Sequence, residues 1–164
     1  MNTLKLSIAI ILFSIGAARA QFTKAELQVS GLTCSMCSKA TEKSLRTLDF
    51  IGDIKADLNH NVFVLTFKKD VPVNLDQINK KVQNAGFFVN SLKTTFNFDN
   101  IKVNNNAFSY SGDTYRLVNT NDKPLTGQVE LTVVDKGFAP AAVSKKYNLT
   151  ADKTSVGRVY HIAI

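Results

Sequence analysis

The chain contains two cysteines, Cys34 and Cys37, in a C-x-x-C arrangement within the segment GLTCSMC, residues 31–37. Thiolates are the metal-binding form of cysteine. Two of them, with no His, Asp or Glu in the same loop, suit a soft ion that accepts two ligands, such as Cu(I) or Hg(II). A zinc ion would need four ligands. The spacing therefore predicts a soft-metal site at Cys34 and Cys37.

Two other uses of the same pair remain open on the residues alone. A structural disulfide is the default for two cysteines in an exported chain, although a bridge between Cys34 and Cys37 closes a very short loop and stabilises little. A thiol–disulfide oxidoreductase also places C-x-x-C between a strand and a helix. Against that enzyme, the chain has no Trp, and no Pro stands inside or beside the pair.

The elements on either side of the motif are predicted to bring both sulfurs into one small volume. Residues 24–30 alternate strictly between apolar and polar side chains, which indicates a half-buried strand. Gly31 permits a tight exit from that strand, and a helix is predicted over residues 36–48. Cys37 then enters the first helical turn, where unpaired N–H groups and the helix dipole lower a cysteine pKa.

The following residues predict a hairpin, a second helix and a last strand. Strands are expected over residues 52–58 and from Val62 onward, joined by a turn at residues 59–61. Asn74 can cap a helix that Gly86 ends, and residues 87–93 form the last strand. The order βαββαβ is the ferredoxin-like arrangement, in which two helices cover one face of a four-stranded antiparallel sheet.

From Thr94 onward the pattern changes to short strands separated by turn signals, and no helical stripe is recognisable. Strands are expected near residues 114–119, 127–134 and 158–164. The fold class is thus α+β: a metal-binding domain over residues 22–93, followed by a small all-β domain over residues 94–164, an OB-like barrel or a sandwich. The second domain has enough apolar residues for a core of its own, and we expect it to recognise a partner or act as a spacer.

The first twenty residues resemble an export signal. Lys5 precedes an apolar run over residues 6–17, and the tripeptide ARA at residues 18–20 fits a cleavage site. The run is shorter than the roughly 20 residues that a membrane-spanning helix needs. We therefore expect cleavage, a periplasmic or secreted protein, and no membrane insertion of the mature chain.

Charge and motif content exclude other classes of function. The net charge is +7, but the lysines are spread along the chain and no arginine cluster interleaves with aromatic residues, so no nucleic-acid partner is predicted. The chain has no Gly-rich phosphate loop, no Ser-His-Asp set and no paired carboxylates with catalytic spacing. We predict no enzymatic activity.

The segment GLTCSMC, inside a predicted βαββαβ unit, resembles the heavy-metal-associated domain, whose signature is G-M-T/H-C-x-x-C. This family occurs in copper chaperones, metal-transporting P-type ATPases and the periplasmic mercury-binding protein, to which an exported chain is most similar. The resemblance covers about residues 22–93. It implies reversible binding of Cu(I), Hg(II) or another soft ion by Cys34 and Cys37, followed by ligand exchange with the thiols of a protein partner.

Two positions depart from the family pattern. Leu32 stands where the family usually has Met, a residue that packs in the core. Phe87 stands where soluble chaperones have Lys, and where pump domains and the mercury protein have an aromatic residue. The chain thus lacks the Lys that would help to neutralise a bis-thiolate copper site, and Lys39, one helical turn away, is a candidate substitute.

Three further side chains are candidate ligands. Met36 lies between the cysteines and is a candidate third soft ligand, although packing or exposure is the better interpretation. His60 lies in the predicted turn opposite the metal loop, and His161 lies in the last strand. Neither histidine has a ligand partner at recognisable spacing, so both are interpreted as ordinary surface or core residues.

Overall fold

The computed structural model describes residues 21–32, 34–99, 101–119, 125–147 and 157–164. The first part of the chain forms six elements in the order βαββαβ. They are β1 (Gln21–Ser30), α2 (Ser35–Leu45), β2 (Ile51–Asp57), β3 (Val62–Phe67), α3 (Leu75–Asn84) and β4 (Phe88–Asn97). The predicted signal peptide lies outside the described residues.

The sequence patterns behave locally as expected. The alternating residues of β1 put Ala25, Leu27 and Val29 into the core, where each is at most 2% exposed. Asn74 caps α3, because its side-chain oxygen accepts a hydrogen bond from the Gln77 N–H at 3.0 Å. Gly86 follows that helix with a φ of +89°, the left-handed conformation that glycine adopts without strain.

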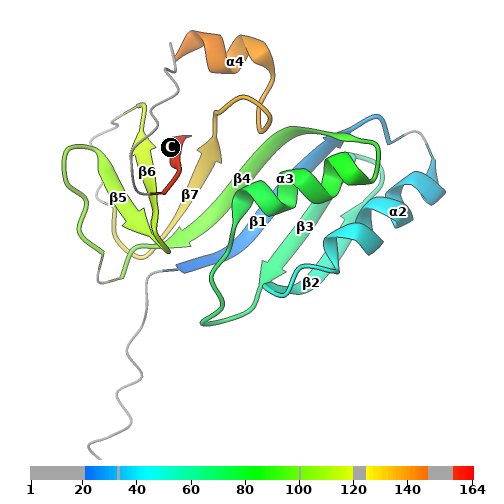
Figure 1. The fold of residues 1–164 in the computed structure, drawn as a ribbon, viewed down its shortest axis with the longest axis horizontal. Helices are drawn as coiled ribbons and strands as arrows, with labels where there is room; N and C mark the ends of the chain where they lie inside the picture. Colours follow the sequence, from blue (N-terminus) through cyan, green and yellow to red (C-terminus); the bar gives the residue numbers. More distant parts are fainter. Residues whose placement is uncertain (1–20, 33, 100, 120–124, 148–156) are drawn as a thin grey trace, which may run out of the picture.

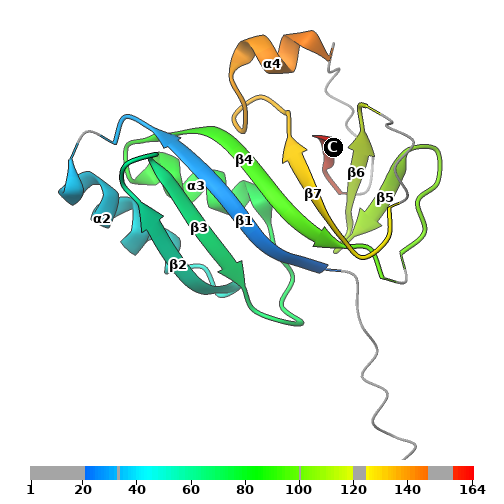
Figure 2. The same ribbon diagram turned by 180° about the vertical axis from the view of Figure 1, so that it is seen from behind.

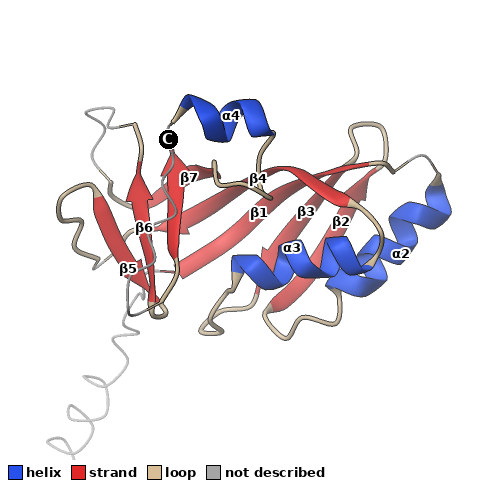
Figure 3. Cartoon of the chain, turned by 45° about the horizontal axis from the view of Figure 1, so that its top comes forward, coloured by secondary structure: helices blue, strands red, loops and turns tan. Residues whose placement is uncertain are grey.

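The ferredoxin-like arrangement is confirmed. The strands pair antiparallel in the order β2-β3-β1-β4, and α2 and α3 lie side by side over one face of them (Figure 1, Figure 3). Seen from behind, β1, β2 and β3 lie in front of the two helices (Figure 2). The apolar faces of the strands and the buried sides of both helices therefore enclose one layer of core.

The second part of the chain is rich in β-structure, as predicted, but it extends the first sheet. Its elements are β5 (Ala107–Tyr110), β6 (Asp113–Leu117), β7 (Gln128–Val133), α4 (Ala141–Lys146) and β8 (Val159–Ala163). Strand β7 pairs with β4, and the eight strands follow the order β2-β3-β1-β4-β7-β8-β6-β5. The predicted boundary between residues 93 and 94 falls inside β4.

The strands curl around an aromatic cluster without closing into a barrel, which was one of the two arrangements predicted for residues 94–164. The Phe22 ring of β1 lies 5.2 Å from the Tyr110 ring of β5, centroid to centroid, although these strands are far apart in the strand order. Among the described residues, no hydrogen-bonded ladder joins β5 to β1 or β2. Hydrogen-bonded neighbouring strands lie about 4.8 Å apart. Strands β1 and β5 are instead in contact through their aromatic side chains.

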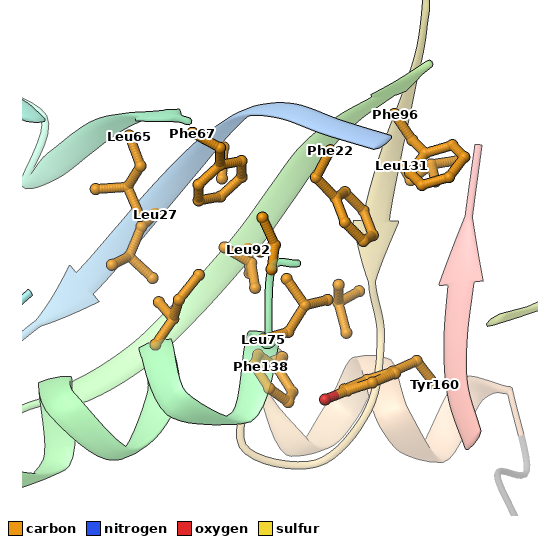
Figure 4. Packing of buried hydrophobic residues seen from close by; sticks show 14 of the residues in the cluster. Phe22, Leu27, Leu65, Phe67, Leu75, Leu92, Phe96, Leu131, Phe138 and Tyr160 are labelled. Carbon is orange, nitrogen blue, oxygen red and sulfur yellow. The ribbon is translucent and has the colours of Figure 1, made fainter. Parts of the chain in front are cut away.

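Both parts of the chain share one hydrophobic core, in place of the separate core that we predicted for residues 94–164. Phe96 of β4 is fully buried and packs against rings from both parts, with centroids 4.8 Å from Phe22 and 4.9 Å from Phe108. Figure 4 shows Phe138 and Tyr160 of the second part beside Leu75 of α3. Burial across the junction therefore stabilises both parts together.

One element of the second part was not predicted. Helix α4 has six residues and begins after Pro140. None of its residues is buried, so it carries no apolar stripe that a sequence pattern could reveal. Its Ser144 hydroxyl donates a hydrogen bond to the carbonyl oxygen of Val134 at 3.0 Å, which holds the helix near the end of β7.

Candidate metal centre

Cys34 is the N-cap of α2. Its backbone is extended, with φ −149° and ψ 159°, and its sulfur accepts a hydrogen bond from the Cys37 N–H at 3.3 Å. An N-cap side chain normally uses an oxygen for this contact, and here a thiol takes that place. The start of the helix therefore fixes the position of Cys34.

The two sulfurs lie side by side. Cys34 Sγ and Cys37 Sγ are 2.7 Å apart, longer than the roughly 2.05 Å of a disulfide bond, so no disulfide joins them in this structure. Cys34 is exposed and Cys37 is half-buried. The sequence prediction that one small volume contains both sulfurs is confirmed, and that volume faces solvent.

Local hydrogen bonds lower the pKa of the Cys34 thiol. The main cause is the contact with the Cys37 side chain, followed by the hydrogen bond from the Cys37 backbone N–H; partial desolvation opposes them, and the Met36 N–H makes the smallest contribution. Donors aimed at a sulfur stabilise its thiolate form. The lowered pKa favours the thiolate form of Cys34, which is the form that binds a metal ion.

The loop before the helix rests on the core. Gly31 adopts a φ of +89°, and a Cβ built on it would lie 3.5 Å from the Phe87 ring, so backbone conformation rather than space favours glycine there. Leu32 and Phe87 are partly buried and pack against the core cluster. The packing role expected for Leu32 is confirmed.

The structure corrects the position of the turn that contains His60. In β1, Gln28 is opposite Val62 of β3, and the Val29 N–H donates to the Asn61 carbonyl oxygen at 3.1 Å. The turn between β2 and β3 therefore lies at the same end of the sheet as the cysteine loop, and not opposite it. An antiparallel pairing of β1 with β3 requires this, because the end of β1 meets the start of β3.

The other candidate ligands do not join the cysteines. His60 is exposed and its Nδ1 lies 2.7 Å from an Asp57 carboxylate oxygen. His161 is 6% exposed in β8, and its Nδ1 lies 2.8 Å from Asp135 Oδ1. Among the described residues, no group of three or more His, Cys, Asp or Glu side chains could hold a metal ion.

Met36 is 71% exposed. The structure confirms exposure over packing for this side chain. Lys39 is also exposed, one turn further along α2. Within the described ranges, Leu58 and Phe88 are the other exposed large apolar side chains besides Met36. Sequence reasoning did not single them out. All three lie at the cysteine end of the sheet, because Phe88 pairs with Ser30 and Leu58 directly follows β2.

The fold and the site define a small α+β domain that presents two thiols at the start of its first helix, supported by a βαββαβ sheet. The family model for the heavy-metal-associated domain matches residues 26–88. Over these residues the chain has the βαββαβ order and the C-x-x-C motif of that domain. The match covers both cysteines and leaves the second part of the chain outside.

Three solved structures of metallochaperones and copper-binding domains are similar to part of the chain. A CopZ metallochaperone is 21% identical, with 41% of this chain and 98% of that chain covered and a TM-score of 0.38. The yeast copper transporter domain CCC2A is 27% identical, with 41% and 90% covered and a TM-score of 0.37. A copper-binding domain from HMA7, a P-type ATPase, is 26% identical, with 40% and 86% covered and a TM-score of 0.36. No curated protein sequence matches the chain.

The described residues contain no membrane-spanning helix. The longest helix, α2, has 11 residues, whereas crossing a bilayer takes about 20.

Proposed function

We propose that this protein carries a soft metal ion, Cu(I) or Hg(II), on Cys34 and Cys37 and passes it to a protein partner by thiolate exchange. The observation that carries the proposal is the pair of sulfurs 2.7 Å apart at the N-terminus of α2, with Cys34 exposed. Soft thiolates bind Cu(I) and similar soft ions. Because the site is exposed, the thiolates of a partner can replace Cys34 and Cys37 as ligands of the ion, one at a time. The heavy-metal-associated domain over residues 26–88 supports this assignment.

Binding requires the sulfurs to separate. A zinc–sulfur bond is about 2.3 Å long. Two sulfurs that bind opposite sides of an ion of similar size would therefore lie roughly 4.6 Å apart. The present separation is 2.7 Å. Cys34 is the exposed member of the pair and precedes the helix, so we expect its side chain to rotate, while the helical backbone fixes Cys37.

A protein partner is favoured by the apolar side chains around the site. Met36 is 71% exposed and Phe88 is 69% exposed at the same end of the sheet as the cysteines. Exposed large apolar residues near one site are typical of protein interaction surfaces. A partner that covers them would bring its own thiols to the bound ion.

We also propose that the protein acts outside the cytoplasm, in the periplasm or as a secreted protein. The support is the apolar run and the ARA tripeptide within residues 1–20. N-terminal sequencing of the protein recovered from the extracytoplasmic fraction tests this. Cleavage after residue 20 is expected, and an intact Met1 in the cell pellet would contradict it.

The test of metal binding is a Cu(I) titration against a chromogenic chelator. The reduced chain from Gln21 onward should bind one ion, and C34S/C37S should bind none. Serine is also a good N-cap, so the variant should keep its fold by circular dichroism. Ser35→Ala, between the cysteines, is the matched control and should bind as the unchanged protein does. Unchanged affinity in C34S/C37S would refute the proposal.

The same proteins test the oxidoreductase alternative. A metal carrier should not accelerate the reduction of insulin by dithiothreitol, because its thiols serve as ligands. Cysteine-dependent turnover, combined with no Cu(I) binding, would assign the pair to thiol–disulfide exchange.

A further inference from the structure

Strand β1 begins at Gln21, the residue that directly follows the tripeptide ARA at residues 18–20. Cleavage there, as proposed above, would make the α-amine of Gln21 the first group of the protein. A glutamine in this position carries an amine and a side-chain amide that can close a five-membered ring with each other. Two groups of one residue react without a bimolecular encounter, which is a large kinetic advantage. About a tenth of α-amines are uncharged and nucleophilic at neutral pH.

The fold holds the amide of Gln21 by its oxygen. The Asp70 N–H donates a hydrogen bond to Gln21 Oε1 at 3.1 Å. Asp70 follows β3, and the antiparallel pairing of β1 with β3 puts the end of β3 beside the start of β1. The contact therefore depends on the tertiary structure, and a short peptide with the same first residues lacks it.

This hydrogen bond favours attack on the amide carbon. A donor aimed at a carbonyl oxygen draws electron density from the carbon and stabilises the negative charge that develops on the oxygen during attack. The contact uses Oε1 and does not involve the amide nitrogen, which is the group that must leave. The Asp70 N–H thus stands where it would assist ring closure.

The rest of β1 anchors the first residue without enclosing it. Phe22 is 2% exposed, and its ring packs 4.8 Å from that of Phe96, centroid to centroid. Gln21 itself is half-buried. The register with β4 begins at Gln21, opposite Asn97, whereas the register with β3 begins at Lys24. One ladder holds the first residue, so its side chain can change conformation while the strand stays paired.

We propose that Gln21 of the exported chain is converted to pyroglutamate, a modification that rests on the cleavage proposed above. The α-amine nitrogen attacks the side-chain carbon Cδ, and the bond from Cδ to the amide nitrogen breaks. The amide nitrogen leaves as ammonia with one proton taken from the amine, and no oxidant, reductant or further reactant is consumed. The lactam keeps Oε1 as an acceptor for the Asp70 N–H, and its nitrogen keeps one N–H donor.

The modification would protect the exposed end of β1. Strand β1 lies between β3 and β4 in the sheet (Figure 2) and leads directly into the cysteine loop. Proteolysis concentrates at chain ends, and an aminopeptidase needs a free α-amine, which a lactam does not offer. Trimming past Phe22 would remove a ring from the shared core. The block would therefore preserve a strand on which both parts of the chain pack.

Mass spectrometry of the intact chain tests the proposal. The chain from Gln21 onward is released with a free amine by cutting a removable leader directly before Gln21, and is then kept at neutral pH. Its mass should fall by that of one ammonia molecule. The rate should be about tenfold higher than in a peptide of residues 21–30, which lacks Asp70, and this gain is below that of a buried oxyanion donor because the contact is exposed. An unchanged mass would overturn the proposal, and equal rates would refute the role of the Asp70 N–H.

Gln21→Glu is the matched control. Glutamate keeps the side-chain length and an oxygen acceptor, but its negatively charged carboxylate resists attack by an amine. Q21E should therefore keep its mass over the same period, and loss of water at a comparable rate would contradict the mechanism. Cu(I) binding by Q21E should be unchanged, because the cysteine loop follows the other end of β1.

The chain expressed with residues 1–20 shows whether the modification occurs in the cell. Mass spectrometry is the readout because a lactam blocks stepwise chemical sequencing. The extracytoplasmic protein should have the mass of residues 21–164 less one ammonia molecule, and pyroglutamyl peptidase should remove its first residue. The full mass of residues 21–164 would overturn the modification. Retention of residues 1–20 would overturn the proposed cleavage, whereas the released chain reports ring closure independently.

Discussion

Arg158, immediately before β8, forms an ion pair with Asp76 in the first turn of α3, with Nη1 and Oδ2 2.7 Å apart. The guanidinium carbon also lies 4.7 Å from the centroid of the Tyr160 ring. A carboxylate in the first turn of a helix is additionally favoured by the helix dipole. One side chain thus ties the end of the chain to a helix of the heavy-metal-associated domain.

Replacing Arg158 by Ala should lower the free energy of unfolding by about 1–2 kcal/mol, the sum expected of a partly exposed ion pair and a cation–π contact. Urea denaturation measures the loss. Asp76→Asn should cost less, because the contact with Tyr160 remains. Lys24→Gln, which removes an exposed pair with Glu26, is the control and should change almost nothing. Equal stability of R158A and the unchanged protein would contradict this interpretation.

Phe96→Ala should destabilise the whole chain by about 3–5 kcal/mol, because it leaves a cavity in a fully packed aromatic cluster. Phe88→Ala, in the same strand, removes a ring that is 69% exposed and should cost little. Because the core is shared, F96A should still unfold in a single transition by both near-ultraviolet and far-ultraviolet circular dichroism. Two separate transitions would show that the parts of the chain have independent cores.

A fragment of residues 94–164 should not fold alone. It lacks β1, which pairs with the other edge of β4, and with β1 it loses the Phe22 ring that packs on Tyr110 and Tyr115. A fragment of residues 22–93 loses Phe96 and should be less stable than the whole chain, while its two cysteines keep their loop. Thermal melts of both fragments give the answer, and a cooperative melt of residues 94–164 would contradict the shared core.

Alkylation of Cys34 should depend on pH with a midpoint below that of an ordinary thiol. Its pKa is lowered by contacts with Cys37 and Met36, so the reactive thiolate persists to lower pH than in an unfolded chain, where the pKa is about 8.5. The rate should rise with pH through the lowered pKa and then level off. Mass spectrometry after brief iodoacetamide treatment locates the label. The same midpoint in native and urea-unfolded protein would disprove the role of the folded loop.

The sequence by itself determined the features that depend on neighbouring residues. Strict alternation over residues 24–30 specified which side chains of β1 are buried. Asn74 and Gly86 marked the two ends of α3, because capping and left-handed geometry are requirements of the local backbone. The position of Cys37 in the first turn of a helix followed from the same kind of pattern. The cysteine pair, on which the proposed function depends, was therefore visible before any tertiary structure.

Only the tertiary structure decided how the strands of the second part are paired. A short sequence that alternates between apolar and polar residues is compatible with a barrel, a sandwich or an extension of an existing sheet, because each arrangement buries one face of every strand. In the βαββαβ unit, one edge of β4 has no neighbouring strand, and in this protein β7 pairs with that edge. The same long-range packing brought Ser44 of α2 against Lys81 of α3, placed the His60 turn at the cysteine end and paired Arg158 with Asp76. These contacts join residues that are far apart in the chain, and their energies depend on a geometry that no local pattern contains.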